Sequence, residues 1–168
     1  MSRGDRLEVS RTIAAPADRL YAMVSDLPRM GEWSSENTGG KWVKGATGPV
    51  VGARFKGANR NGWRRWSTNV TVVEADPGRA FVFDVTSMGL GVARWGYRFH
   101  PADDAAGANG PAAPSTHVTE FWEDHRSPVI ARITGLAVGV ADRTVHNRAG
   151  MDATLAALAA AVESPAGR

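Results

Sequence analysis

The 168-residue sequence predicts an α+β fold in which a meander of about six antiparallel strands precedes one long C-terminal helix. Two observations lead to this fold class. Short runs of alternating apolar and polar residues follow one another between residues 42 and 124, which is typical of half-buried strands. From residue 128 to about residue 163, apolar residues instead recur at helical spacing. We expect a single domain over residues 5–163, with residues 1–4 and 164–168 as flexible tails.

One strand and two short helices are predicted before the meander. Residues 5–13 alternate between apolar and polar side chains, which favours a strand. In the helix that follows, Pro16 suits the first turn, and Pro28 ends the helical pattern. A second short helical turn is expected to end near Trp33.

The two-residue period is clearest near the end of the meander. In residues 93–100, the aromatic residues Trp95, Tyr97 and Phe99 share one face of the strand, and two arginines share the other. We expect the aromatic face to point toward the interior and the arginines toward water. A long loop rich in alanine, glycine and proline, residues 101–115, joins this strand to the last one.

The C-terminal helical pattern contains two glycines four residues apart, Gly135 and Gly139. A glycine in a helix interior costs about 1 kcal/mol relative to alanine. Two interpretations stay open: the glycines leave space for a ligand beside the helix, or they only let the helix approach the sheet closely. The uncharged stretch between Arg132 and Asp142 is too short to cross a bilayer, which takes about 20 apolar residues.

Composition excludes several classes of function. The sequence has no cysteine, which excludes disulfides and cysteine-based zinc sites, and its four histidines are dispersed, so we expect no metal. Lysine and arginine total 20 against 17 acidic residues, without the basic stripe of a nucleic-acid-binding protein. The first residues lack the apolar run of a signal peptide, so we expect a cytoplasmic protein without a transmembrane segment.

Glu120 is the best candidate for a catalytic or ligand-anchoring group. The sequence contains neither a Gly-x-Ser-x-Gly nucleophile elbow nor a phosphate-binding loop. On the last strand, Val118, Glu120 and Trp122 share one face. If that face points inward, desolvation raises the pKa of the Glu120 carboxyl, as a general acid or base requires. The alternative is a structural ion pair at the edge of the sheet.

Three segments resemble the SRPBCC superfamily, which includes START, polyketide cyclase/dehydratase and pollen-allergen-like proteins. Residues 9–33 resemble its opening strand and two short helices ending in a tryptophan. Residues 93–101 and 115–124 are similar to its paired late strands, and residues 147–163 resemble its closing helix. The resemblance implies the helix-grip fold, a curved antiparallel sheet of about six to seven strands wrapped around a long C-terminal helix.

The helix-grip resemblance also implies a cavity between the sheet and the long helix. Six tryptophans, most of them in the strand region, favour an aromatic lining with a few polar groups. We expect the cavity to be lined by Trp33, which would close one end, and by Phe55, Asn59, Trp66, Phe81, Phe83, Trp95, Tyr97, Glu120, Trp122, Ile133, Leu136 and Val140.

Three functions fit this resemblance. The preferred one is binding or transport of a hydrophobic small molecule of lipid, polyketide or isoprenoid type, without a cofactor, by a monomer or weak homodimer. The second is an enzyme of the cyclase, aromatase or dehydratase type that uses the same cavity, with Glu120 as its acid or base. The third is a protein-interaction or stress-related module with a filled core, which would expose an apolar patch instead.

Overall fold

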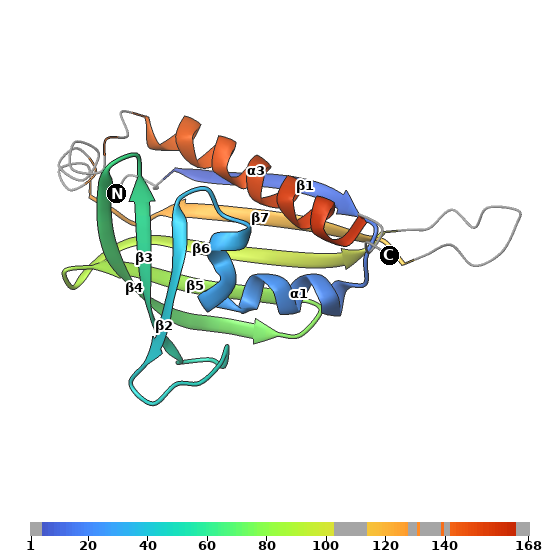
Figure 1. Ribbon diagram of the computed structural model, residues 1–168, viewed down its shortest axis with the longest axis horizontal. Coiled ribbons are helices and arrows are strands. Elements are labelled where there is room, and N and C mark those ends of the chain that lie inside the picture. Colours follow the sequence, from blue (N-terminus) through green and yellow to red (C-terminus); the bar gives the residue numbers. More distant parts are fainter. Residues whose placement is uncertain (1–4, 103–113, 128–130, 132–138, 140–141, 164–168) are drawn as a thin grey trace, which may run out of the picture.

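The structure, a computed structural model, describes residues 5–102, 114–127, 131, 139 and 142–163. Within these residues, seven strands, a 3-10 helix and two α-helices follow one another in the predicted order (Figure 1). Their bounds are β1 Arg6–Ile13, α1 Ala17–Ser25, η1 Leu27–Glu32, β2 Asn37–Val43, β3 Arg54–Asn61, β4 Arg64–Asp76, β5 Ala80–Ser87, β6 Leu90–Pro101, β7 Thr116–Asp124 and α3 Arg143–Glu163.

The seven strands form one antiparallel sheet in the order β1-β7-β6-β5-β4-β3-β2. Strands β2 to β7 are sequential neighbours and make up the predicted meander of six. The first strand pairs with the last, so that Val9 lies opposite Glu120 and Ile13 opposite Thr116. The α+β helix-grip class is therefore confirmed: short helices follow the first strand, and the long C-terminal helix packs on the sheet.

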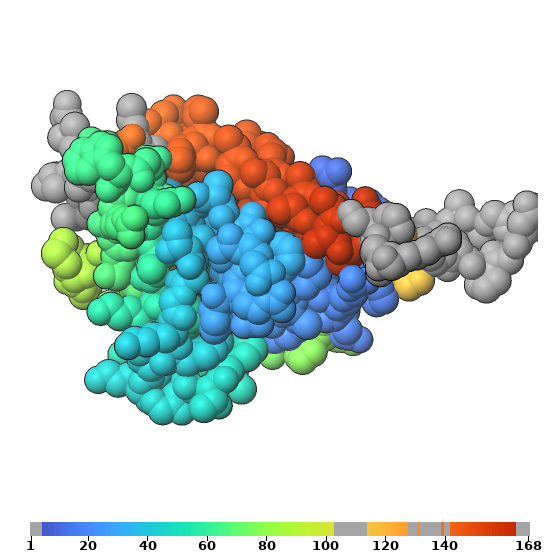
Figure 2. Space-filling model, in the orientation of Figure 1, coloured from blue at the N-terminus to red at the C-terminus, as the bar shows by residue number. Residues whose placement is uncertain are grey.

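The helices cover different parts of the sheet. Helix α3 lies along β1 and β7, whereas α1 packs against β5 and β6 (Figure 1). Seen in space-filling form from the same side, α1, η1 and α3 meet over the sheet (Figure 2). Beneath them the core contains the fully buried side chains of Ile13, Leu20, Val24, Phe81, Val118 and Leu158.

Strand β6 confirms the predicted division between an aromatic inner face and a charged outer face. Tyr97 and Phe99 are buried on the inner face because every second residue points toward the helices. On the outer face, the Arg94 guanidinium donates two hydrogen bonds to Asp84, at 2.7 and 3.0 Å. The convex side of the sheet is thus solvated and ion-paired, as expected for an antiparallel sheet covered on one side.

The long helix begins later than the apolar periodicity predicts. Gly139 lies in an exposed turn with φ +73°, and α3 begins at Arg143, so placing this glycine inside a helix was wrong. A positive φ belongs to the left-handed region and cannot continue a right-handed helix. Asp142 caps the helix instead, because its Oδ1 accepts a hydrogen bond from the Val145 backbone N–H at 3.1 Å. Gly135 lies outside the described residues.

Candidate functional site

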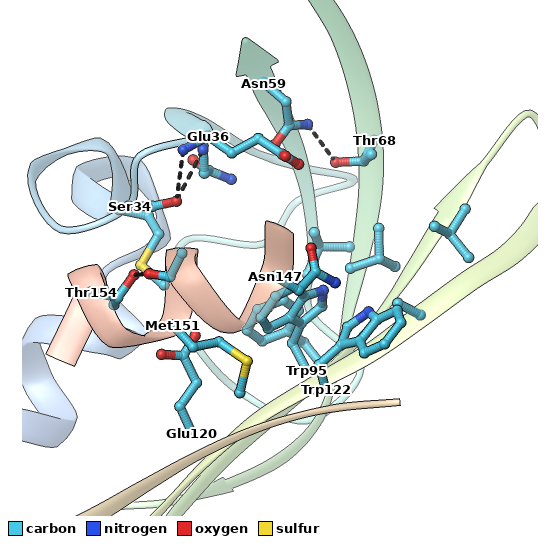
Figure 3. A pocket seen from close by; sticks show the side chains of 18 of the residues that line it. Ser34, Glu36, Asn59, Thr68, Trp95, Glu120, Trp122, Asn147, Met151 and Thr154 are labelled. Carbon is cyan, nitrogen blue, oxygen red and sulfur yellow. Dashed lines mark hydrogen bonds between the residues drawn. The ribbon is translucent and has the colours of Figure 1, made fainter. Parts of the chain in front are cut away.

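A cavity of about 150 Å³ lies between the inner face of the sheet and the N-terminal half of α3 (Figure 3). The sheet contributes a mostly aromatic wall, and the segment after η1 and the first turns of α3 contribute polar groups. The described lining residues from β3 to β7 include Phe55, Asn59, Trp66, Thr68, Val70, Phe83, Val85, Trp95, Tyr97, Glu120 and Trp122.

The structure brings together eight of the predicted lining residues: Phe55, Asn59, Trp66, Phe83, Trp95, Tyr97, Glu120 and Trp122. Two others do not line this cavity. Phe81 instead packs beneath α1, with its ring centroid 6.1 Å from that of Tyr21, and Trp33 is half-buried beside the core. Ile133, Leu136 and Val140 fall outside the described part of the chain.

Trp95 and Trp122 form the aromatic part of the wall. They are direct cross-strand partners on β6 and β7, so their side chains leave the sheet side by side. Their ring centroids are 6.4 Å apart with an interplanar angle of 51°. Together they offer the cavity a broad apolar surface, suited to the flat or apolar part of a small molecule.

Glu120 lies on the inner face of β7 directly opposite Tyr97 of β6. Val118, Glu120 and Trp122 share the inner face of β7: all three are buried, and Glu120 and Trp122 line the cavity. The Tyr97 hydroxyl donates a hydrogen bond of 2.9 Å to Glu120 Oε1, whereas Oε2 is buried and has no hydrogen-bond partner. Within the described residues Glu120 forms no ion pair, and the two arginines that line the cavity, Arg126 and Arg143, pair with Asp124 and Glu36. The structural ion pair considered as an alternative role for Glu120 is therefore not seen among these residues.

The surroundings of Glu120 keep its carboxyl group protonated. Burial raises its pKa to about 8; the Tyr97 hydrogen bond opposes this shift, and the negative charge of Asp152 adds to it. Burial also raises the pKa of the Tyr97 hydroxyl well above its ordinary value, with Glu120 contributing in the same direction. At neutral pH the pair is therefore largely uncharged, and Glu120 can donate a hydrogen bond or a proton into the cavity.

Glu36 ties the segment after η1 to the first turns of α3 at the rim of the cavity. Its carboxylate accepts two hydrogen bonds from the Arg143 guanidinium, at 2.8 and 3.1 Å, and lies 2.9 Å from His146 Nε2. The Ser34 hydroxyl oxygen holds this segment in place by accepting hydrogen bonds from the backbone N–H groups of residues 36 and 37 (Figure 3). Although Asp142 and His146 are one helical turn apart, their side chains have different partners: Asp142 caps the helix and His146 contacts Glu36.

Three further cavity residues, Asn147, Met151 and Thr154, are absent from the predicted set. Their i, i+4, i+7 spacing places them on one face of α3. This spacing is visible in the sequence and could have identified them. Thr154 Oγ1 donates a hydrogen bond to the Gly150 carbonyl at 3.0 Å. Asn147 Nδ2, by contrast, is buried without a partner.

Two further findings concern the described residues alone. No three histidine, aspartate or glutamate side chains there gather closely enough to hold a metal ion. No helix in that part of the chain is both long and apolar enough to span a membrane.

Comparison with known proteins gives one family. Residues 5–163 match the family model described as polyketide cyclase / dehydrase and lipid transport. A polyketide cyclase-like protein from Corynebacterium glutamicum is 32% identical, with a TM-score of 0.59, over 97% of this chain and 94% of its own. No protein with a curated description matches the chain.

More distant structures share the fold. A protein from Chromobacterium violaceum is 15% identical over 96% of this chain and 99% of its own, with a TM-score of 0.66. The di-domain ARO/CYC protein BexL, from the BE-7585A biosynthetic pathway, is 18% identical over 96% of this chain but 48% of its own, with a TM-score of 0.63. The family match over residues 5–163 and the 32% identity to the Corynebacterium glutamicum protein show that the chain belongs to the polyketide cyclase/dehydrase and lipid transport family of the SRPBCC superfamily.

Proposed function

We propose that this protein binds a hydrophobic small molecule, of lipid, polyketide or isoprenoid type, in the cavity between the sheet and α3. The observation that carries the proposal is a cavity with an aromatic wall that also contains a buried carboxyl group with an unpartnered oxygen. Ligand sites combine an apolar lining with a few polar groups that fix orientation. The lipid-transport description of the family agrees with such a ligand.

The size of the cavity indicates how much of the ligand is enclosed. An apolar protein cavity of about 150 Å³ accommodates a benzene-sized molecule. The enclosed part of the ligand is therefore about one ring, or an alkyl segment of similar volume, beside Trp95 and Trp122. A larger ligand extends toward the rim at Glu36 and Arg143.

Native mass spectrometry of freshly purified protein, followed by denaturing extraction, tests this proposal directly. We expect a retained apolar compound, or binding of the neutral fluorescent probe N-phenyl-1-naphthylamine by the empty protein. Trp95→Ala is expected to weaken probe binding about tenfold, because the aromatic contact is lost. The matched control is Trp63→Ala, since Trp63 is 81% exposed and does not line the cavity.

An empty protein that binds no probe would overturn the proposal and favour the protein-interaction module. Equal losses in the Trp95 and Trp63 variants would place the binding site outside the cavity.

A second candidate function, catalysis in the same cavity, is favoured by the raised pKa of Glu120. A carboxyl group with a pKa of about 8 can act as a general acid near neutral pH. An enzyme of the cyclase or dehydratase type is expected to lose turnover in Glu120→Gln while it still binds the extracted compound. Unchanged turnover in that variant would remove Glu120 from any catalytic role.

A further inference from the structure

Two buried polar atoms in the cavity wall have no hydrogen-bond partner: Glu120 Oε2 on the sheet and Asn147 Nδ2 on the helix. The two residues are only 3% and 4% exposed. A buried polar group without a partner destabilises a protein, because it has lost its hydrogen bonds to water without replacing them. Both atoms belong to residues that line the same cavity, and each lacks a partner that a bound molecule could supply.

Both unpartnered atoms act as hydrogen-bond donors. The Asn147 amide nitrogen carries two N–H groups. Glu120 Oε1 accepts a hydrogen bond from the Tyr97 hydroxyl, which leaves Oε2 to carry the proton of the neutral carboxyl group. In Figure 3, Met151 lies between Asn147 and Glu120, and the two tryptophan rings lie beside Asn147. A ligand that satisfies the donors must therefore present acceptor oxygens on an otherwise apolar body.

We propose that Asn147 and Glu120 determine specificity by selecting ligands whose apolar body carries a hydrogen-bond acceptor, such as a ketone oxygen, over pure hydrocarbons. The inference rests on the proposed function, because it assigns the specificity of the same cavity. A hydrocarbon of equal shape fills the space beside Trp95 and Trp122 but leaves both donors unsatisfied. A site with buried hydrogen-bonding groups discriminates against an analogue that lacks the matching group for this reason.

The test compares two small probes that differ in one oxygen, the bicyclic ketone 1-tetralone and the hydrocarbon tetralin, by isothermal titration calorimetry at neutral pH. We expect the wild-type protein to prefer the ketone. Asn147→Leu is expected to lower ketone affinity about tenfold while tetralin binds as before or more tightly. Arg148→Leu is the matched control on the same helix, since Arg148 is exposed and does not line the cavity.

Two substitutions at Glu120 provide an independent measurement. Glu120→Gln keeps a donor at this position and is expected to retain the preference for the ketone, whereas Glu120→Leu is expected to lose it. Asn147→Leu removes an unpaired buried donor, so its thermal unfolding is expected at or above the wild-type temperature. An unchanged ketone-to-tetralin ratio in Asn147→Leu, or no preference in the wild type, would overturn this inference and leave the proposed function intact. Failure of the wild type to bind either probe would overturn this inference, and the proposed function would be overturned as well only if the protein also retains no compound and does not bind N-phenyl-1-naphthylamine.

Discussion

The two ends of the interior differ, although one sheet forms the floor of both. Beneath α1, the rings of Tyr21, Phe81 and Phe99 meet edge-on, and Leu20 and Phe81 are fully buried. Beneath the N-terminal half of α3, the same sheet borders a cavity of about 150 Å³ that contains polar side chains.

We infer from this difference that the packed end of the sheet provides stability and that the other end provides the proposed binding site. Close packing gives the end under α1 the largest contribution to stability per side chain. The side chains around the cavity make fewer such contacts, and the buried polar atoms of Glu120 and Asn147 there lack hydrogen-bond partners. We therefore expect substitutions at the packed end to act on unfolding, and substitutions at the cavity end to act mainly on binding and on pH dependence.

The largest expected effect contrasts two phenylalanines on the same face of β5. Phe81→Ala is expected to lower the free energy of unfolding by about 3–5 kcal/mol, because it opens a hole in a fully packed region. Phe83→Ala is expected to cost about 1–2 kcal/mol less, because Phe83 already borders the cavity and has fewer neighbours to lose. Urea unfolding of both variants measures the difference. Equal losses would mean that the two ends are packed alike.

The sheet could be predicted from the sequence to a large extent. Alternation along β6 and β7 assigns Tyr97 and Glu120 to the inner face because the period of a strand is two. Their pairing across the strands depends on the register between β6 and β7. The sequence of the connecting residues 101–115 does not determine that register. The individual residues were therefore predictable, and their hydrogen bond was not.

The cavity rim and the start of α3 were not predicted, for two different reasons. The Glu36–Arg143 contact joins residues 107 positions apart, and no local pattern reports such a pairing. The helix start, in contrast, has a local signal: Asp142 is a preferred N-cap residue, directly before Arg143. The apolar periodicity of the preceding segment, which extends the helical pattern upstream, outweighed that signal.

A second prediction concerns the pH dependence of stability at the cavity end. Because the folded-state pKa of Glu120 is raised to about 8, the folded protein holds a proton that the unfolded chain releases above its ordinary glutamate pKa. Stability is therefore greatest at low pH within this window and falls as pH rises toward 8. Between pH 6 and pH 7.5 we expect the free energy of unfolding to fall by about 2 kcal/mol.

Glu120→Gln removes this titration and is expected to flatten the stability profile over that pH range. Glu123→Gln on the outer face of the same strand is the control, and it should keep the wild-type slope. Urea unfolding at several pH values measures both. A wild-type profile as flat as that of Glu120→Gln would mean that Glu120 titrates at its ordinary pKa.

The smallest expected effect contrasts two glutamates that each accept two hydrogen bonds from an arginine. Glu36 and Arg143 at the cavity rim are each 21% exposed, whereas Glu32 and Arg29 on η1 are 46% and 60% exposed. Glu36→Gln is expected to lower the free energy of unfolding by about 1 kcal/mol, because a half-buried ion pair is screened less by water. Glu32→Gln is expected to leave unfolding unchanged, since exposed pairs contribute little.

Amide hydrogen exchange in the first turns of α3 should quicken in Glu36→Gln alone, because only that substitution weakens the attachment of this helix to the segment after η1. If both variants leave unfolding and exchange unchanged, the Glu36 contacts do not hold the rim, and α3 is positioned by its packing on β1 and β7.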